Sequence, residues 1–553
     1  MKFTKDNTIL DFFYNWEKET PENVYLKQPF GNTWKEFTWK ETGVQVRTIA
    51  SYLNSLKLPE KSNIALISKN CAEWIITDLA IMISGHISVP LYPTLNGPQI
   101  NHVLMHSGCK VAFIGKLDDW KSMKSGIPTD VKCISFPTYN PDNSHEQWND
   151  ILKNHKPFME NYKPLMSDIN TIIYTSGTTG NPKGVMATYG SFSECIKNTE
   201  HMTFLNRPNN KFFSYLPLCH IAERNIVEAV SIISGGTVYF ADTLDSFAQN
   251  LREASPTHFL AVPRIWTKFQ QGILSKMPQK KLNLFLSIPI LNSIVKKKIR
   301  AGLGLNETII ILTGAAPMPT YLIQWFRKIG IIIQEAYGMT ENLGAVCMMP
   351  AGKIKDGTVG KIYPNMEVKI SPENGEILNR SAWNMFGYYK EPKLTAETID
   401  SEGWLHTGDV GEVDSEGYLK ITGRVKEMYK TSKGEYIAPS PIEVGFAENT
   451  NIEQVCLVGQ SLPQPIALII ASEISKQLSK EELVDALKET LKTLNPTLKS
   501  YERVQKIVVM KEPWTVENNK LTPTMKIKRN VIEKEFESKF EEWYEAKETI
   551  VFE

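Results

Sequence analysis

Apolar runs of strand length alternate with helical patterns in the first part of this chain, and that alternation constrains the fold more than any other feature. Residues 63–67 are apolar, residues 72–84 follow with helical spacing, and residues 86–91 and 110–115 are again apolar. Strands joined by helices pair in parallel, and helices cover both faces of such a sheet. Further strands are predicted at residues 211–216, 237–240, 308–313 and 331–335. The sequence therefore predicts an α/β fold with a mostly parallel sheet.

The length of the chain predicts more than one domain. Its 553 residues, of which 42% are hydrophobic, exceed the roughly 250 to 300 residues at which a single core stops growing. After Gly423 the elements become shorter and more charged. We therefore predict a large N-terminal domain over residues 1–423, with βαβ-type sheets covered by helices. A small mobile α+β domain is predicted over residues 424–553.

The charge balance argues against a nucleic acid partner. Lys and Arg number 62 and Asp and Glu number 61, a formal net charge of +1, so nothing global attracts a polyanion. The seven cysteines show no CxxC spacing, which fits neither a zinc site nor a disulfide scaffold and indicates reduced thiols. The sequence shows no secretory signal and no apolar run of about 18 residues. We expect a cytoplasmic protein, either a monomer or a homodimer.

One apolar stretch, residues 282–295, lies between two lysines on one side and three on the other. Such a segment can rest on a membrane surface or meet anionic phosphates. It can also form a surface helix whose lysines snorkel over a buried face, and this second interpretation is the one we favour. Peripheral contact with the inner face of a membrane stays open as an expectation.

The segment YTSGTTGNPKG, residues 174–184, follows an apolar run and predicts a phosphate-binding loop. Glycines let backbone N–H groups approach a polyanion, hydroxyls add donors, and Lys183 adds a positive charge. The common pattern GxxxxGK[ST] does not fit, because Lys183 precedes Gly184 rather than following a glycine. The residues predicted to hold phosphates with Lys183 are Thr175, Ser176, Gly177, Thr178, Thr179 and Gly180.

Two later segments add groups suited to a nucleotide. LTGAAPMP, residues 312–319, ends a predicted strand in small residues that leave room for a flat ring. EAYGMTE, residues 335–341, offers the ring of Tyr337 for stacking, the hydroxyl of Thr340 for phosphate and the carboxylate of Glu341. Mg²⁺ prefers oxygen ligands and bridges a carboxylate to substrate phosphates. Glu341 is therefore the predicted metal ligand, and the Thr175 hydroxyl is a second candidate.

Three more motifs follow toward the C-terminus. GWLHTGDVG, residues 403–411, places Asp409 in a glycine-bounded turn, where it could accept hydrogen bonds from a ribose diol. ITGRVKEMYKTSKGEYIAP, residues 421–439, carries Arg424 and several lysines. LTPTMKIKRN, residues 521–530, is a lysine-rich turn before a charged helical tail.

Together these motifs resemble those of the adenylate-forming (AMP-binding) superfamily, in its long-chain fatty acid:CoA ligase (acyl-CoA synthetase) branch. The resemblance covers nearly the whole chain. It implies that a fatty acid reacts with ATP and Mg²⁺ to give an acyl-adenylate and pyrophosphate, and that the thiol of coenzyme A then displaces AMP. The ATP-binding residues it implies beyond the loop are Gly314, Ala315, Ala316, Glu335, Ala336, Tyr337, Gly338, Met339, Thr340, Asp409, Ile421 and Arg424.

The resemblance also assigns catalytic roles. Lys526 would reach across the domain interface to the carboxylate and the α-phosphate, with Glu341 on the metal and Arg424 on ribose or phosphate. His220, in FFSYLPLCHIAERN, would lie beside the acyl carboxylate, although a histidine satisfied within the core is the alternative. Lys528 and Arg529 are expected on a solvated face.

A second conformation is implied by the need to admit a thiol. Lys426 matches the family's hinge, about which the small domain would turn to withdraw Lys526. Lys433, Gly434 and Glu435 would then border the coenzyme A tunnel. Two alternatives stay open: an adenylating enzyme that passes its acyl group to a carrier protein or another acceptor, and a non-catalytic nucleotide or lipid binder.

Overall fold

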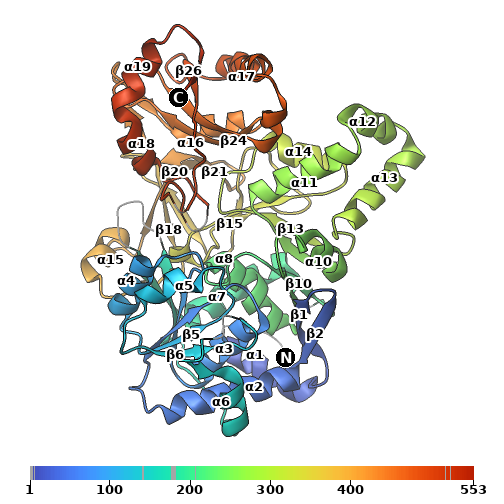
Figure 1. The fold of residues 1–553 in the computed structure, drawn as a ribbon, viewed down its shortest axis with the longest axis vertical. Helices are drawn as coiled ribbons and strands as arrows, with labels where there is room; N and C mark the ends of the chain where they lie inside the picture. Colours follow the sequence, from blue (N-terminus) through green and yellow to red (C-terminus); the bar gives the residue numbers. More distant parts are fainter. Residues whose placement is uncertain are drawn as a thin grey trace.

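A computed structural model describes residues 4, 6–139, 142–175, 182–205, 207–516, 518–522 and 525–553. Figure 1 shows two sheet-containing layers that make up the larger lobe, a smaller lobe formed by the last part of the chain, and a helical arm that projects from the side. The mixed α/β architecture confirms the predicted fold class.

The first sheet contains eight strands among the described residues. Its order is β19-β9-β8-β4-β3-β5-β6-β7, and it is parallel from β8 to β7. The strands are β3 (Asn63–Ile67), β4 (Ile87–Leu91), β5 (Val111–Ile114), β6 (Lys132–Ser135), β7 (Glu146–Gln147), β8 (Ile169–Thr175), β9 (Lys183–Thr188) and β19 (Gly387–Tyr388). The predicted strand at 63–67 and the predicted helix from residue 72, α3 (Ala72–Ile83), are both present.

Both faces of this sheet are buried. Along β3, Ile64 and Leu66 pack into one core and Ala65 and Ile67 into another, because successive side chains of a strand point to opposite faces. The first of these cores also takes in Leu26 and Val238 of the second sheet. The two sheets therefore share a core. Helices α1 (Ile9–Glu19), α2 (Trp39–Ser55) and α3 contribute to it.

The second sheet contains thirteen strands among the described residues, in the order β17-β18-β20-β21-β16-β15-β14-β13-β12-β10-β11-β1-β2. The stretch from β14 to β1 is parallel, whereas β15 to β21 pair antiparallel. The parallel strands are β1 (Val24–Phe30), β10 (Lys211–Ser214), β11 (Thr237–Phe240), β12 (His258–Leu260), β13 (Ile310–Thr313) and β14 (Gln334–Tyr337). The antiparallel ones are β2 (Thr33–Thr38), β15 (Cys347–Met348), β16 (Gly360–Ile362), β17 (Glu367–Ile370), β18 (Glu376–Arg380), β20 (Leu405–Val413) and β21 (Tyr418–Arg424).

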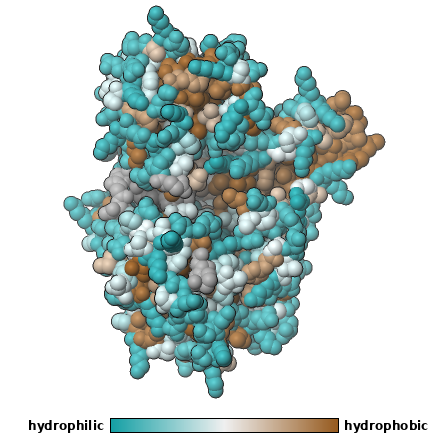
Figure 2. Space-filling view, in the orientation of Figure 1, coloured by the Kyte–Doolittle hydropathy of each residue, from teal (hydrophilic) through white to brown (hydrophobic). Residues whose placement is uncertain are grey.

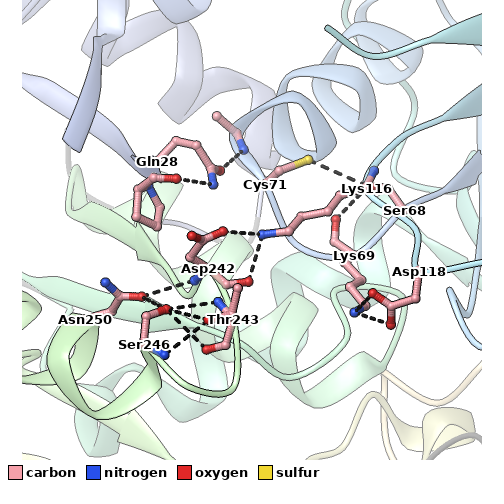
Figure 3. A network of polar contacts seen from close by, with 12 residues as sticks. Gln28, Ser68, Lys69, Cys71, Lys116, Asp118, Asp242, Thr243, Ser246 and Asn250 are labelled. Carbon is pink, nitrogen blue, oxygen red and sulfur yellow. Dashed lines mark hydrogen bonds and ion pairs between the residues drawn. The ribbon is translucent and has the colours of Figure 1, made fainter. Parts of the chain in front are cut away.

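A polar network joins the ends of the two sheets (Figure 3). The ammonium of Lys116, just after β5, donates to the carbonyl and the carboxylate of Asp242, just after β11, at 2.8 and 2.9 Å. Asn250 of α10 (Phe247–Ala254) accepts from the backbone N–H of Asp242 at 3.2 Å. This network holds the carboxyl ends of parallel strands from the two sheets next to each other. Ligands of open α/β sheets bind at the carboxyl ends of the strands.

The last part of the chain forms a sheet of its own, β24-β25-β26-β27. It consists of β24 (Ile452–Val458), β25 (Ile466–Ala471), β26 (Lys506–Val509) and β27 (Ile550–Phe552), with α16 (Pro439–Phe446), α17 (Lys480–Leu494), α18 (Arg529–Phe536) and α19 (Phe540–Glu545) around it. Its two cores contain only residues from Tyr429 onward. Strand β21 belongs to the large sheet and ends at Arg424. The boundary at 423/424 stays a prediction.

The smaller lobe touches the larger one through polar contacts. Arg264 of α11 (Pro263–Lys276) forms an exposed ion pair with Glu453. The hydroxyl of Tyr321, on α14 (Thr320–Lys328), donates to the carbonyl of Ala447 at 2.7 Å. These contacts belong to the relative orientation of the lobes seen in Figure 1.

The seven cysteines are free, as predicted. Burial raises the pKa of thiols such as those of Cys195 and Cys456 to about 12, so these side chains behave as small apolar groups. Among the described helices, none combines the length and the apolar character needed to cross a bilayer.

Candidate nucleotide and acyl site

The phosphate loop connects two paired strands. β8 and β9 are antiparallel, and Thr175 lies directly opposite Lys183, so both residues stand at the mouth of the loop. The ammonium of Lys183 lies 5.3 Å from the centroid of the Tyr388 ring. The other predicted loop residues lie outside the described part of the chain: Ser176, Gly177, Thr178, Thr179 and Gly180.

The two segments predicted around the adenine leave neighbouring strands at the same edge. Thr313 of β13 pairs with Glu335 of β14, so the backbone after each strand emerges side by side. A Cβ atom at Gly314 would lie 2.9 Å from the carbonyl oxygen of Ala336, which requires glycine there. Ala315 adopts a φ of +65°, a conformation uncommon for residues with a side chain. Ala315 and Ala316 are both exposed, consistent with a surface open to a flat ligand.

The EAYGMTE segment bends sharply after Tyr337. A Cβ atom at Gly338 would lie 2.2 Å from the carbonyl carbon of Gly344, so no other residue fits. The backbone N–H of Met339 donates to the Asn342 side chain at 2.8 Å and closes the turn. Thr340 and Glu341 are buried as a result. Burial also raises the pKa of Glu335, at the start of the segment, to about 8.

Glu341 is buried near two positive charges. Burial raises the pKa of its carboxyl, while a hydrogen bond from Tyr388 and the charges of Lys183 and Arg424 act against that rise. The Tyr388 hydroxyl donates to Oε1 of Glu341 at 2.8 Å. Tyr388 therefore touches both Glu341 and Lys183. Sequence reasoning missed this residue, because it comes from the short strand β19, far along the chain from both partners.

Asp409 is held by two donors. Its Oδ1 accepts from Nε of Arg424 at 2.7 Å, and its Oδ2 accepts from the Tyr337 hydroxyl at 2.6 Å. Asp409 and Arg424 lie directly opposite on β20 and β21, where Ile421 is also partly buried. A carboxylate has about four lone-pair sites, so Asp409 retains acceptor capacity for a diol. Asp409, the residue predicted to bind the ribose, thus holds the hydroxyl of Tyr337, the residue predicted to stack on adenine.

Lys526 extends from a tight loop of the smaller lobe. Leu521 and Ile527 form an antiparallel bridge below the loop. The backbone N–H of Lys526 donates to the Thr522 hydroxyl at 3.0 Å, and Met525 takes a φ of +63° to turn the chain. Leu521 is buried, which anchors the start of this segment in the smaller lobe.

The Lys526 ammonium meets the charges of the large lobe. The side chain retains solvent exposure, yet protein surrounds the ammonium, and this desolvation together with repulsion by Arg424 lowers the pKa of Lys526. The carboxylates of Asp409, Glu427 and Glu341 act in the opposite direction. Residues predicted from motifs more than 100 positions apart therefore face one crevice.

His220 borders the same crevice. It caps α8 (Ile221–Glu223), where its Nδ1 accepts from the backbone N–H of Ala222 at 3.2 Å. The hydrogen bond assigns the ring proton to Nε2 in the neutral form. Burial, and secondarily repulsion by the Lys526 ammonium, lower the pKa of His220 to about 4. His220 is therefore an uncharged hydrogen-bond donor at neutral pH.

Asn70 positions the segment before His220 and was not found from the sequence. Its Nδ2 donates to the Ser214 hydroxyl at 2.8 Å and to the Leu216 carbonyl at 2.6 Å, and its Oδ1 accepts from the Leu218 N–H at 3.1 Å. The one signal available was its place just after β3, at the carboxyl end of a parallel strand.

The predicted hinge and coenzyme A residues are exposed. Lys426 is exposed in a turn directly after β21. Lys433, Gly434 and Glu435 are exposed in the loop of a small hairpin, β22 (Tyr429–Lys430) and β23 (Tyr436–Ile437). Gly434 has a φ of +85°. In this orientation of the lobes, Lys526 is the lysine presented to the nucleotide residues.

The expectation for Arg529 is wrong. Its side chain is only 11% exposed and pairs with Glu443 at 2.6 Å. Arg529 also donates to the carbonyl of Leu457. It therefore fastens α18, directly after the Lys526 loop, to α16 and β24.

Comparisons with known proteins identify the family of this chain. The AMP-binding enzyme family matches residues 13–389, and the AMP-binding enzyme C-terminal domain matches residues 427–548. The chain is 31% identical to long-chain-fatty-acid–CoA ligase 5 of Rattus norvegicus, over 91% of this chain and 84% of that protein. It is 28% identical to long-chain-fatty-acid–CoA ligase FadD15 of Mycobacterium bovis, over 97% of each.

A solved structure shares the fold. O-succinylbenzoate coenzyme A synthetase from Bacillus subtilis, in complex with ATP and magnesium ion, superposes with a TM-score of 0.71 at 21% identity, over 94% of this chain and 98% of that chain. The fold and the site define an adenylate-forming enzyme. This chain belongs to the AMP-binding enzyme family, in its acyl-CoA synthetase branch.

We predict that the imidazole of His220 stays neutral from pH 8 down to about pH 5, because burial and Lys526 both penalise its charged form. The test is histidine NMR of the labelled protein, with the signal assigned by its loss in His220→Asn. Asparagine can still cap the helix, so the variant should fold. A pKa near the ordinary 6.5 would contradict the burial described here.

Proposed function

We propose that this enzyme ligates a fatty acid to coenzyme A with ATP, through an acyl-adenylate, and releases AMP and pyrophosphate. One observation carries the proposal: Lys526 of the smaller lobe is near enough to Arg424, Asp409 and Glu341 of the larger one for their charges to act on its ammonium. The relatives named as long-chain-fatty-acid–CoA ligases support the choice of substrate class.

The first half-reaction brings two anions together, so it needs positive charge at the α-phosphate. Lys526 would bridge the acid's carboxylate and an α-phosphate oxygen, and Arg424 would contact ribose or phosphate. Lys183 would hold the β- and γ-phosphates at the mouth of the loop. Desolvation, and secondarily the charge of Arg424, lower the pKa of Lys526, and a bound anion beside the ammonium would act against both effects.

The residues present fit Mg²⁺. The candidate ligand Glu341 is a buried carboxylate next to the phosphate hairpin, and the Thr175 hydroxyl lies at its mouth. Among the described residues no cluster of three or more His, Cys, Asp or Glu side chains forms a closed cage, and Mg²⁺ does not need one, because it is commonly held by one or two carboxylates and substrate phosphates. When bound, the ion would neutralise the leaving pyrophosphate.

His220 would receive the fatty acid's carboxylate. A neutral imidazole that donates from Nε2 would orient the carboxylate through a hydrogen bond and add no second positive charge beside Lys526. Asn70 fixes the backbone before His220 and so would set the carboxylate's position. An apolar tunnel would add about 0.8 kcal/mol for each methylene group buried.

The second half-reaction requires Lys526 to leave. A rotation about Lys426 would withdraw it and bring Lys433, Gly434 and Glu435 toward the acyl-adenylate, where they would border the coenzyme A tunnel. We place the enzyme in the cytoplasm, because its seven cysteines are free thiols. A monomer or a homodimer fits this cycle equally.

The activity is tested directly by incubating the purified protein with ATP, Mg²⁺, coenzyme A and acids of graded chain length. We expect acyl-CoA, AMP and pyrophosphate, with the highest kcat/KM for a long-chain acid. Adenylate formation without a thioester would instead indicate transfer to a carrier protein or another acceptor. No ATP consumption with any acid would overturn the proposal.

Lys526→Ala should reduce adenylate formation by about 100-fold or more, because it removes a charge made to contact the reacting atoms. Thioester formation from supplied acyl-adenylate should change little. Pyrophosphate exchange measures the first step, and acyl-CoA release measures the second. Lys528→Ala, in the same loop region, is the matched control and should retain both rates; equal loss of both steps in Lys526→Ala would contradict the assignment.

Tyr388→Phe should raise the Mg²⁺ concentration needed for half-maximal adenylate formation. The change removes one hydrogen bond to Glu341, worth roughly tenfold for a charged acceptor. Tyr389→Phe is the matched control, since the Tyr389 hydroxyl contacts Asn63 and Ser107 instead. A Mg²⁺ dependence identical in the two variants would rule out a role for Tyr388 at the metal.

A further inference from the structure

The helical arm is packed along only one side. Helices α12 (Gln279–Ser287) and α13 (Pro289–Gly302) form a hairpin that projects from the larger lobe (Figure 1). Leu282 and Val295 are buried in the core beneath it, with Phe285 and Leu286 partly buried against that core. The expectation of a surface helix over a buried face therefore holds for this side.

The other side of the hairpin is apolar and exposed. Figure 2 shows hydrophobic surface over the projecting arm. The exposed fractions are 59% for Leu284, 41% for Ile288, 76% for Ile290 and 45% for Ile294. No charged residue occurs between positions 282 and 295. A helix apolar on both sides is stable in water only when something covers its outer face.

The arm is also strongly basic. Nine Lys and Arg residues and no Asp or Glu occur between positions 254 and 306, in a chain whose net charge is +1. Five of these lysines are exposed near the two ends of the hairpin: Lys276, Lys280, Lys281, Lys297 and Lys298. None of the five has an acidic partner among the described residues. The apolar tip is therefore flanked by uncompensated positive charge.

We infer that this hairpin docks the enzyme on an anionic lipid bilayer. Its apolar tip, Leu284 to Ile294, would enter the interfacial region, and the flanking lysines would lie at the lipid phosphates. Helices of 9 and 14 residues reach only about 14 and 21 Å, short of the roughly 30 Å of hydrocarbon. The arm therefore rests in one leaflet.

The charge pattern selects a bilayer over other partners. A second copy of this chain would place the two lysine clusters against each other, since a two-fold interface uses the same surface twice. A nucleic acid would pair with the lysines but leave the apolar tip in water. An anionic bilayer satisfies both features. Docking does not depend on the proposed activity, although it would place the enzyme where long-chain acids partition.

The test is flotation of the full-length protein with vesicles, without ATP or coenzyme A. We expect binding to vesicles of phosphatidylcholine mixed with phosphatidylglycerol, and at least tenfold weaker binding to phosphatidylcholine alone. Lys280→Glu/Lys281→Glu should weaken binding to the mixed vesicles by about tenfold or more. Ile290→Asn should weaken it as well. Matched controls are Lys153→Glu/Lys156→Glu and Leu165→Asn, which change exposed residues elsewhere and should bind like the unmodified protein.

Three results would overturn the inference: no binding by the unmodified protein, equal binding to both kinds of vesicle, or hairpin variants that bind like the controls. Light scattering adds a second readout. A lower oligomeric mass in Ile290→Asn, with unchanged vesicle binding, would assign the hairpin to contact between copies instead. Acyl-CoA formation from a water-soluble acid without vesicles should be equal in all variants, which separates failure of docking from failure of the proposed function.

Discussion

The candidate site depends on the placement of two cations, Lys526 of the smaller lobe and Arg424 of the larger one, close enough for their charges to interact. Desolvation of the Lys526 ammonium, and secondarily repulsion by Arg424, lower the pKa of Lys526. The carboxylates of Asp409, which accepts from Arg424 at 2.7 Å, and of Glu341 act against this lowering. The fold holds this charge in place with anchored elements, namely a bridged loop beneath Lys526 and the paired strands β20 and β21.

The predicted catalytic and binding side chains are held in place by other residues, which contact them or the backbone beside them. Tyr388 connects Glu341 with Lys183, and Asn70 fixes the backbone that leads to His220. Each lies at the end of a strand whose neighbours come from distant parts of the sequence. Gly338 acts differently, because the close approach of Gly344 leaves no room for a side chain. Such constraints preorganise the site, which is how electrostatic stabilisation acts without reorganising the protein.

Local patterns predicted much of the fold, and their failures have physical causes. The apolar run at residues 63–67 is a strand because both its faces are buried. The strand predicted at 331–335 instead runs from Gln334 to Tyr337, since Ile331 and Ile333 pack in the core before β14 begins. The predicted parallel pairing is present at the centre of each large sheet. After β14 the strands pair antiparallel, because short connections favour that arrangement. Such connections cannot be read from apolar periodicity alone.

The site residues were predictable where a motif places several chemical groups together, as in EAYGMTE. They were not predictable where the residue that contacts them lies far away in the sequence. Arg529 looks solvated within a lysine-rich string, yet Glu443 lies 86 positions earlier and buries it. The contacts between the lobes have the same long-range origin and are weak. An exposed ion pair such as Arg264–Glu453 contributes about 0–1 kcal/mol, and one hydrogen bond joins Tyr321 to Ala447. Two such contacts cost little free energy to break, so the proposed turn of the smaller lobe needs only a ligand that binds the second orientation slightly more tightly than the first.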